Sequence, residues 1–184
     1  VPKIMVETLQ KNAHQKDYLP VRGLPELRET IADYFQRNYQ LPTTADEIMI
    51  GPGSKELIYN FQVAFKIDEL LLPNPSWVSY EPQAQLTNHK VSWLKTEGKN
   101  NWKILPKDIE NHCKKAPNLK RTIILNYPSN PIGITYNSDE LKSLASNSET
   151  EKRNSFFKLY NDCPIPKNER LANSGLFVKR QDLT

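Results

Sequence analysis

The 184-residue sequence predicts an α/β fold, a three-layer sandwich built on a mostly parallel sheet. From residue 46 to about residue 145, short runs with the character of strands alternate with longer helical patterns, which is typical of βαβ units. Near-continuous apolar strands such as Leu70-Leu71-Leu72 are expected to be buried on both faces, which is characteristic of parallel sheets. A content of 38% hydrophobic and 25% charged residues agrees with an ordinary globular domain.

The first expected element is a helix that begins near Leu24, with Pro25 suitably placed in its first turn. Apolar residues recur on one face of this helix, namely Leu27, Ile31, Tyr34 and Phe35. Charged residues are expected to point outward from it, namely Arg28, Glu29 and Asp33.

The alternation that follows predicts four strands, each followed by a helix. The strands are expected over residues 47–50, 69–72, 90–95 and 122–125, and the helices over residues 54–65, 76–86, 106–115 and 139–145. Ser76 would serve as the N-cap of the second of these helices, and Pro82 would kink it.

After Ala145 the sequence changes character. Residues 146–154 form a polar run without helical or strand periodicity, so we expect a folded part over residues 1–145 and a divergent polar tail over residues 146–184. The tail is either poorly ordered or a region that packs against something else.

Charge, cysteine content and hydropathy exclude several classes of function. The net charge is +4, but basic and acidic residues are interspersed, so we expect no nucleic-acid partner. Cys113 and Cys163 lie apart from each other without a cluster of histidines, which indicates a reduced protein without a metal site. No apolar run approaches the length of a membrane span and the N-terminus resembles no signal peptide, so a cytoplasmic location is expected.

The first motif that bears on function lies between residues 48 and 55. The apolar run Ile48-Met49-Ile50 leads into Gly51-Pro52-Gly53-Ser54-Lys55 and then a helix. Glycines let a backbone approach a phosphate, and a helix N-terminus offers it free N–H groups. The alternative is a purely structural turn. The Walker pattern does not fit, because Glu56 follows Lys55 where that pattern requires Ser or Thr.

Two further motifs follow the next strands. In Pro73-Asn74-Pro75-Ser76-Trp77, the ring of Trp77 either offers a flat face for stacking or caps the core. In the segment 126–133, Asn130 either binds a ligand or satisfies the backbone of its own turn. Ligands of open α/β sheets bind beyond the carboxyl ends of the strands, which favours Asn130 as a ligand contact. The bonds Asn74-Pro75 and Asn130-Pro131 are candidates for the cis form.

Taken together and in this order, the motifs resemble the large domain of the class I/II aminotransferases, which are pyridoxal-phosphate enzymes of fold type I. The resemblance spans residues 18 to about 145 and includes the segments 18–28, 77–80 and 126–133. It implies that the backbone amides of Gly53, Ser54 and Lys55 hold the cofactor phosphate. It further implies that Trp77 stacks on the pyridine ring and that Asn130 bonds the 3-hydroxyl oxygen. Tyr18 would reach the phosphate of the neighbouring subunit, which implies a homodimer.

The resemblance also implies features that these 184 residues lack. A complete family member continues into a strand that ends in an aspartate and a tyrosine, and then into Ser-x-Ser-Lys and a nearby arginine. The aspartate keeps the pyridine nitrogen protonated, and the lysine binds the cofactor covalently and moves the substrate proton. We therefore expect an incomplete large domain, without a catalytic residue of its own, from a lineage that transfers amino groups between amino acids and 2-oxo acids.

Two other interpretations remain open at this point. The chain could be a non-catalytic module that binds pyridoxal phosphate or another phosphate, or that pairs with a full-length relative through the surface near Tyr18. It could also be a degraded remnant without function, because a truncated parallel sheet exposes an edge and apolar surface.

Overall fold

The computed structural model describes residues 1–40, 42–149 and 154–160. The chain divides into two compact units, and their described parts are residues 1–40 and 42–54 (the first unit) and residues 55–149 and 154–160 (the second unit). In the parts of the chain that are described, no helix is both long enough and apolar enough to span a membrane.

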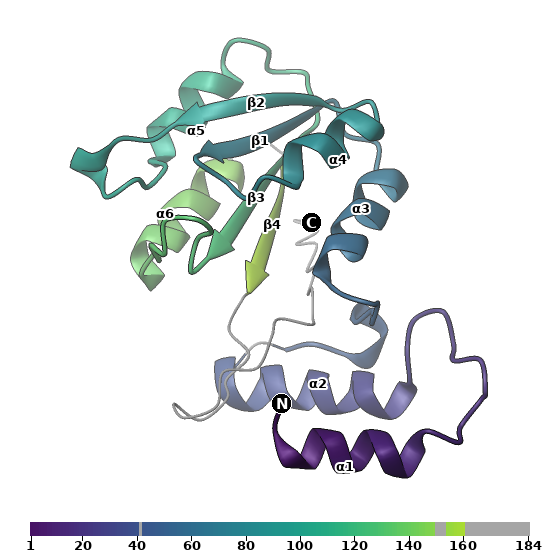
Figure 1. The fold of residues 1–184 in the computed structure, drawn as a ribbon. Coiled ribbons are helices and arrows are strands. Elements are labelled where there is room, and N and C mark those ends of the chain that lie inside the picture. The colour runs from purple at the N-terminus through teal and green to yellow at the C-terminus, as the bar shows by residue number, and fades with distance from the viewer. Residues whose placement is uncertain (41, 150–153, 161–184) are drawn as a thin grey trace. The chain divides into compact units, whose positions relative to one another are not determined.

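The first unit contains two helices and a short 3-10 helix. These are α1 (Lys3–Asn12), α2 (Pro25–Tyr39) and η1 (Ala45–Glu47) (Figure 1). Pro25 occupies the first turn of α2, as predicted, because a proline there has no intrahelical N–H bond to lose. Phe35 of the predicted apolar face is buried, whereas Leu27 is partly exposed. The helix α1 was not predicted, and it exposes several apolar side chains, namely Ile4, Met5, Val6 and Leu9.

Two predictions about the first unit are wrong. Arg28 does not point outward: its side chain is buried, with the residue only 8% exposed, because its guanidinium group bonds backbone carbonyl oxygens of Ala45 and Ile48. Residues 47–50 were expected to form a strand, but Glu47 ends η1 and residues 48–50 lie outside the sheet. The Ile50 N–H instead donates to the Arg22 carbonyl at 3.0 Å, and this one hydrogen bond does not make a strand pair.

The second unit is an α/β fold with a small parallel sheet, as predicted. Its helices are α3 (Ser54–Ala64, whose first residue lies in the first unit), α4 (Tyr80–Leu86), η2 (Gly98–Asn100), α5 (Pro106–Cys113) and α6 (Ser138–Glu149). Its strands are β1 (Glu69–Asn74), β2 (Lys90–Lys95), β3 (Arg121–Tyr127) and β4 (Asn154–Tyr160). The four described strands are all parallel and lie in the order β2-β1-β3-β4.

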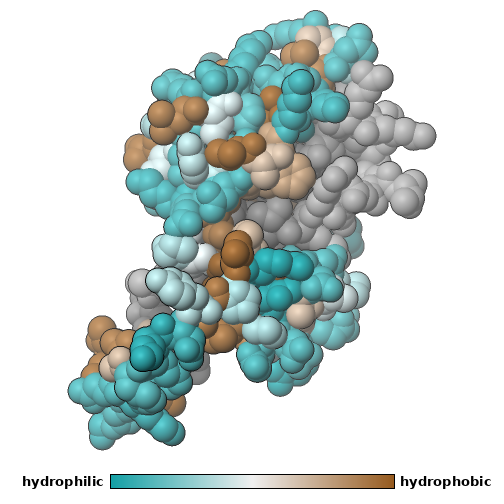
Figure 2. Space-filling model, turned by 90° about the vertical axis from the view of Figure 1, so that its right-hand side faces the viewer, coloured by the Kyte–Doolittle hydropathy of each residue, from teal (hydrophilic) through white to brown (hydrophobic). Residues whose placement is uncertain are grey.

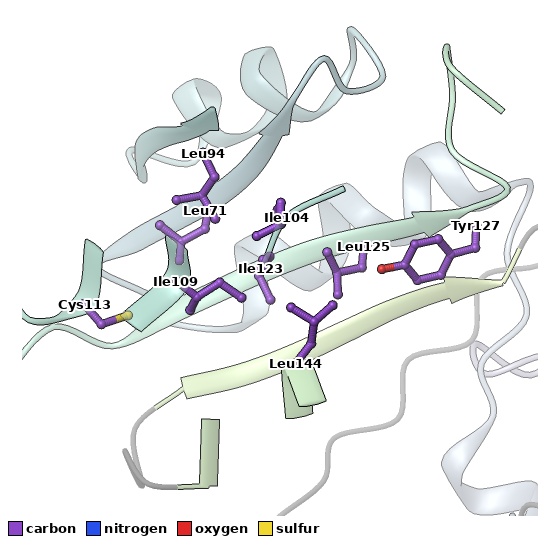
Figure 3. Packing of buried hydrophobic residues seen from close by; sticks show 9 residues of the cluster. All are labelled: Leu71, Leu94, Ile104, Ile109, Cys113, Ile123, Leu125, Tyr127 and Leu144. Atoms are coloured by element: carbon purple, nitrogen blue, oxygen red, sulfur yellow. The ribbon is translucent and has the colours of Figure 1, made fainter. Parts of the chain in front are cut away.

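Helices cover both faces of this sheet, so the predicted three layers are present (Figure 1). Side chains alternate between the two faces along each strand. Toward α3 and α4 point Leu70, Leu72 and Ile124. Toward α5 and α6 point Leu71, Ile123 and Leu125, which pack with Ile109 and Leu144 of those helices (Figure 3). The apolar strands are therefore buried on both faces, as their composition predicts. Hydrophilic side chains cover much of the surface seen in Figure 2, where apolar ones form separate groups.

Three details of the second unit differ from the prediction. The helix α4 begins at Tyr80 rather than Ser76, so Ser76 is not its N-cap. Pro82 then lies in the first turn of α4, where its missing N–H removes no helical hydrogen bond and a kink is not required. The helix expected over residues 139–145 extends to Glu149 as α6.

The expected polar tail contains a strand. The strand β4 pairs in parallel with β3 over its whole length, from Arg121↔Asn154 to Tyr127↔Tyr160. The predicted boundary at residue 145 stays a prediction, because residues 150–153 and 161–184 of the expected tail lie outside the described residues.

Candidate functional site

A cavity lies in the second unit at the carboxyl ends of β1 and β3, the edge of the sheet where ligands of open α/β folds bind. About 350 Å³ of space lies between its walls, a figure that includes the open solvent at its mouth. Its lining comes from the last residues of both strands, the segments that follow them and the loop residue Trp102: Pro73, Pro75, Ser76, Trp102, Leu125, Asn126, Tyr127, Ser129, Asn130, Ile132, Ile134 and Tyr136. The predicted ligand contact Asn130 is among them.

The segments that lead into the cavity have an unusual backbone. Asn74-Pro75 and Asn130-Pro131 are both cis, which confirms the prediction for each bond. Tyr127-Pro128 is cis as well, which was not predicted. The Gly133 N–H donates to the Ser129 carbonyl at 2.6 Å and the Ser129 N–H to the Ile134 carbonyl at 2.8 Å, so the turn around Asn130 is closed by its own backbone. The side chain of Asn130 is exposed at this turn.

One wall of the cavity consists of two neutral phenols. The rings of Tyr127 and Tyr136 meet edge to face with their centroids 4.7 Å apart, and the Tyr136 hydroxyl accepts a hydrogen bond from the Ile104 N–H at 2.7 Å. Burial raises the pKa of Tyr136 to about 12 and raises that of Tyr127 further. Both hydroxyls therefore stay protonated at neutral pH. The buried Ser129 Oγ has no hydrogen-bond partner among the described residues, which leaves a polar atom beside the cavity.

Asn126 connects the end of β3 to the opposite helical layer. Its side chain lines the cavity and also bonds the hydroxyl of Tyr80, the first residue of α4. Burial raises the pKa of Tyr80 above its ordinary value, so this hydroxyl is also neutral. The contact fixes the end of β3 relative to α4.

Trp77 lies between β1 and α4 and is half-buried. It packs against the apolar cluster on that face and meets Tyr80 edge to face, with ring centroids 5.4 Å apart. This packing supports the reading of Trp77 as a cap on the core. The Lys55 ammonium group lies 5.8 Å from the centroid of the Trp77 ring, a cation–π distance. The structure thus brings Lys55 and Trp77 together, and stacking of a ligand on Trp77 stays a prediction.

The other predicted site residues belong to the first unit. Gly53 has a φ of +113°, which favours glycine, and its N–H donates to the Gly51 carbonyl at 2.7 Å. Ser54 is the first residue of α3, where backbone N–H groups lack intrahelical partners. The side chain of Tyr18 is fully exposed. Their assembly with Trp77 and Asn130 into one pocket stays a prediction.

Sequence reasoning missed several residues that the structure brings to the site. Tyr127, Tyr136 and Trp102 line the cavity, yet they lie in no pattern that separates them from core aromatics. Trp102 comes from the loop between β2 and α5, whose path cannot be read from periodicity.

Comparison with known proteins gives a consistent result. The family "Aminotransferase class I and II" matches residues 1–155. An aspartate aminotransferase of Bacillus sp. (strain YM-2) is 35% identical over 130 residues, which cover 70% of this chain and 32% of that protein. The chain therefore spans about a third of the length of this relative.

Two solved structures of aspartate aminotransferases are also similar. The enzyme of Thermus thermophilus with maleate has a TM-score of 0.76 and 27% identity, covering 86% of this chain and 41% of its own. The enzyme of Rhizobium meliloti has a TM-score of 0.79, covering 85% of this chain and 40% of its own. At 24% identity, this second likeness shows the fold alone.

Proposed function

Because the chain belongs to the class I and II aminotransferase family, we propose that its residues supply the phosphate-binding and ring-binding part of a pyridoxal-phosphate pocket. The observation that carries the proposal is the placement of Asn130 beside a cavity at the carboxyl ends of β1 and β3. The order of the motifs along the sequence would not by itself require Asn130 to lie beside a cavity.

The side chains present fit the cofactor chemically. The cavity offers amide and hydroxyl groups beside neutral aromatic rings, which suits a flat polar heterocycle. Lys55 carries a positive charge near the start of α3, and a helix start attracts a phosphate. When bound, pyridoxal phosphate supplies an electron sink for chemistry at the α-carbon of an amino acid. In our proposal Ser54 and Lys55 bind the phosphate, Trp77 supports the ring and Asn130 bonds the ring oxygen.

We further propose that these 184 residues do not transaminate by themselves. The sequence contains no Ser-x-Ser-Lys segment, so the lysine that moves the substrate proton in the family has no counterpart here. Amino acids and 2-oxo acids are then substrates only of an assembly that supplies this group.

Equilibrium binding tests the first proposal. Titration with pyridoxal 5′-phosphate should show saturable binding, and Asn130→Ala should weaken it, whereas Asn111→Ala on the exposed side of α5 should not. Equal binding by both variants, or none by the parent chain, would reject the pocket. An assay with aspartate and 2-oxoglutarate tests the second proposal: amino transfer, or a cofactor–lysine adduct trapped by borohydride during turnover, would show it wrong.

A second candidate function is pairing with another subunit. The side chain of Tyr18 is fully exposed in the single chain. A side chain that contacts the site of a neighbouring subunit must be free in this way before the subunits pair. Light scattering of the chain alone and mixed with a full-length relative tests this. A monomer in both samples would reject pairing.

A further inference from the structure

We propose that Arg28 is a positioning residue for the phosphate site, and this inference rests on the proposed role of Ser54. All residues that carry the argument belong to the first unit. Arg28 lies in the second turn of α2, at a position where periodicity predicts a solvated side chain. It is instead buried, so its charge must be compensated by specific contacts.

The contacts of Arg28 hold the segment that leads to the glycine turn. Its Nε donates to the Ala45 carbonyl at 2.9 Å and to the Ile48 carbonyl at 3.0 Å. Its Nη2 donates to the Ala45 carbonyl at 2.6 Å and to Asp46 Oδ1 at 3.1 Å. A guanidinium group is planar and its donors point in fixed directions, so these bonds fix the orientation of residues 45–48 relative to α2.

A second set of contacts anchors the same segment at Ile50, two residues after Ile48. The Ile50 N–H donates to the Arg22 carbonyl at 3.0 Å. The guanidinium group of Arg22 donates to Asp46 Oδ1, which also accepts from Arg28, and to the Asp46 carbonyl oxygen. Gly23 allows the close approach: its φ is +93°, and a Cβ there would lie 2.5 Å from the Cβ of Ile50. Residues 45–50 are thus fixed by side-chain and backbone bonds immediately before the turn.

The glycine turn over residues 51–53 is short, so the direction of its backbone depends on how residues 45–50 are held. Ile50 is three residues before Gly53, and the Gly53 N–H is turned inward to the Gly51 carbonyl. The direction of the next amide, at Ser54, therefore depends on where Ile50 is held. Loss of the Arg28 bonds would let the segment shift, and binding through a backbone N–H is sensitive to such shifts because hydrogen bonds weaken with misalignment. Arg28 would act on a bound phosphate through Ser54, without touching it.

Comparison of two ligands separates this role from a general loss of stability. We would measure the dissociation constants of pyridoxal 5′-phosphate and of pyridoxal, which lacks the phosphate, for the parent chain, Arg28→Lys and Arg28→Met. Arg37→Met is the matched control, since Arg37 lies on the same helix with an exposed side chain. Both Arg28 variants should weaken pyridoxal-phosphate binding by about tenfold or more, as changes to residues behind a ligand contact often do. Binding of pyridoxal should be unchanged.

The outcomes distinguish this inference from the function on which it rests. If the parent chain prefers pyridoxal phosphate and folded Arg28 variants keep that preference, the positioning role is wrong and the pocket stands. If the parent chain binds both ligands equally or neither, the phosphate site is wrong and the inference falls with it. If Arg28→Met does not fold, Arg28→Lys and Asp46→Ala decide, because Asp46 is exposed and truncation of its side chain removes one side-chain contact of each arginine.

Discussion

Replacement of Glu69 by Gln should strongly destabilise the second unit and flatten its dependence on acid pH. Glu69 and Arg121 are 1% and 2% exposed, and Arg121 Nε donates to Glu69 Oε2 at 2.6 Å. The other carboxylate oxygen accepts from Ser92 Oγ at 2.5 Å and lies 3.2 Å from His112 Nε2 and 3.3 Å from Lys90 Nζ. One carboxylate thus connects β1 to β2, β3 and α5.

The size of the effect follows from the pKa of this carboxyl group. Burial alone would raise the pKa of Glu69, but hydrogen bonds from Ser92, Arg121 and His112 outweigh it and lower the pKa from 4.5 to about 2. A carboxylate with a lowered pKa stabilises the folded state at pH values above its unfolded pKa, and this contribution is lost as the pH falls through the folded pKa. The shift corresponds to about 3 kcal/mol, lost between about pH 5 and pH 2.

Urea unfolding at a series of pH values measures this contribution. At pH 7, Glu69→Gln should lower the free energy of unfolding by about 3–5 kcal/mol, because it leaves the guanidinium group of Arg121 buried without its counter-charge. Between pH 5 and pH 3 the parent chain should lose stability more steeply than the variant. The control Glu110→Gln breaks an exposed pair with Lys114 and should cost less than about 1 kcal/mol. Equal slopes for the parent chain and Glu69→Gln would refute the reasoning.

Two further predictions concern packing, and both are measured by urea unfolding. Gly23→Ala should lower the free energy of unfolding by about 3 kcal/mol, because the new Cβ would meet Ile50 at a positive φ. Gly98→Ala, whose Cβ would have only ordinary contacts at 3.9 Å, should lower it by less than about 1 kcal/mol. Similar losses for the two variants would contradict the close approach of Gly23 to Ile50. Leu70→Ala should lower the free energy of unfolding by about 2–5 kcal/mol, because Leu70 is fully buried in the sheet. Leu86→Ala, on the exposed side of α4, should lower it by less than about 1 kcal/mol. A Leu70 variant as stable as the Leu86 variant would contradict the assigned core.

The sheet was predictable because its signal is local. The strands β1, β2 and β3 were located to within two residues at each end. For β1 and β3 the signal is an apolar run, because a strand buried on both faces must be almost continuously apolar. The strand β4 was not predicted, because its formation depends on pairing with β3, a contact between distant parts of the chain. Conversely, residues 47–50 have strand-like composition but form no strand.

Arg28 and Ser76 were predicted wrongly, because a local pattern shows neither distant contacts nor where a loop ends. The partners of Arg28 are backbone carbonyls 17 and 20 positions later, and no helical period reveals such contacts. Ser76 was assigned as a cap because serine often begins helices, but the segment after β1 continues to Tyr80 before the helix starts. Asn130 lines the cavity because its position depends on the end of a strand, which the sequence shows clearly, and its contact with a ligand stays a prediction.

The most direct test of the central claim is calorimetric titration of the 184-residue chain with pyridoxal 5′-phosphate, with pyridoxal as the comparison ligand. A pocket with both a phosphate contact and a ring contact predicts saturable binding of one cofactor per chain, at least about tenfold tighter than the binding of pyridoxal. Absence of saturable heat, or equal affinity for the two ligands, would contradict the claim that this chain retains the cofactor-binding part of the aminotransferase fold.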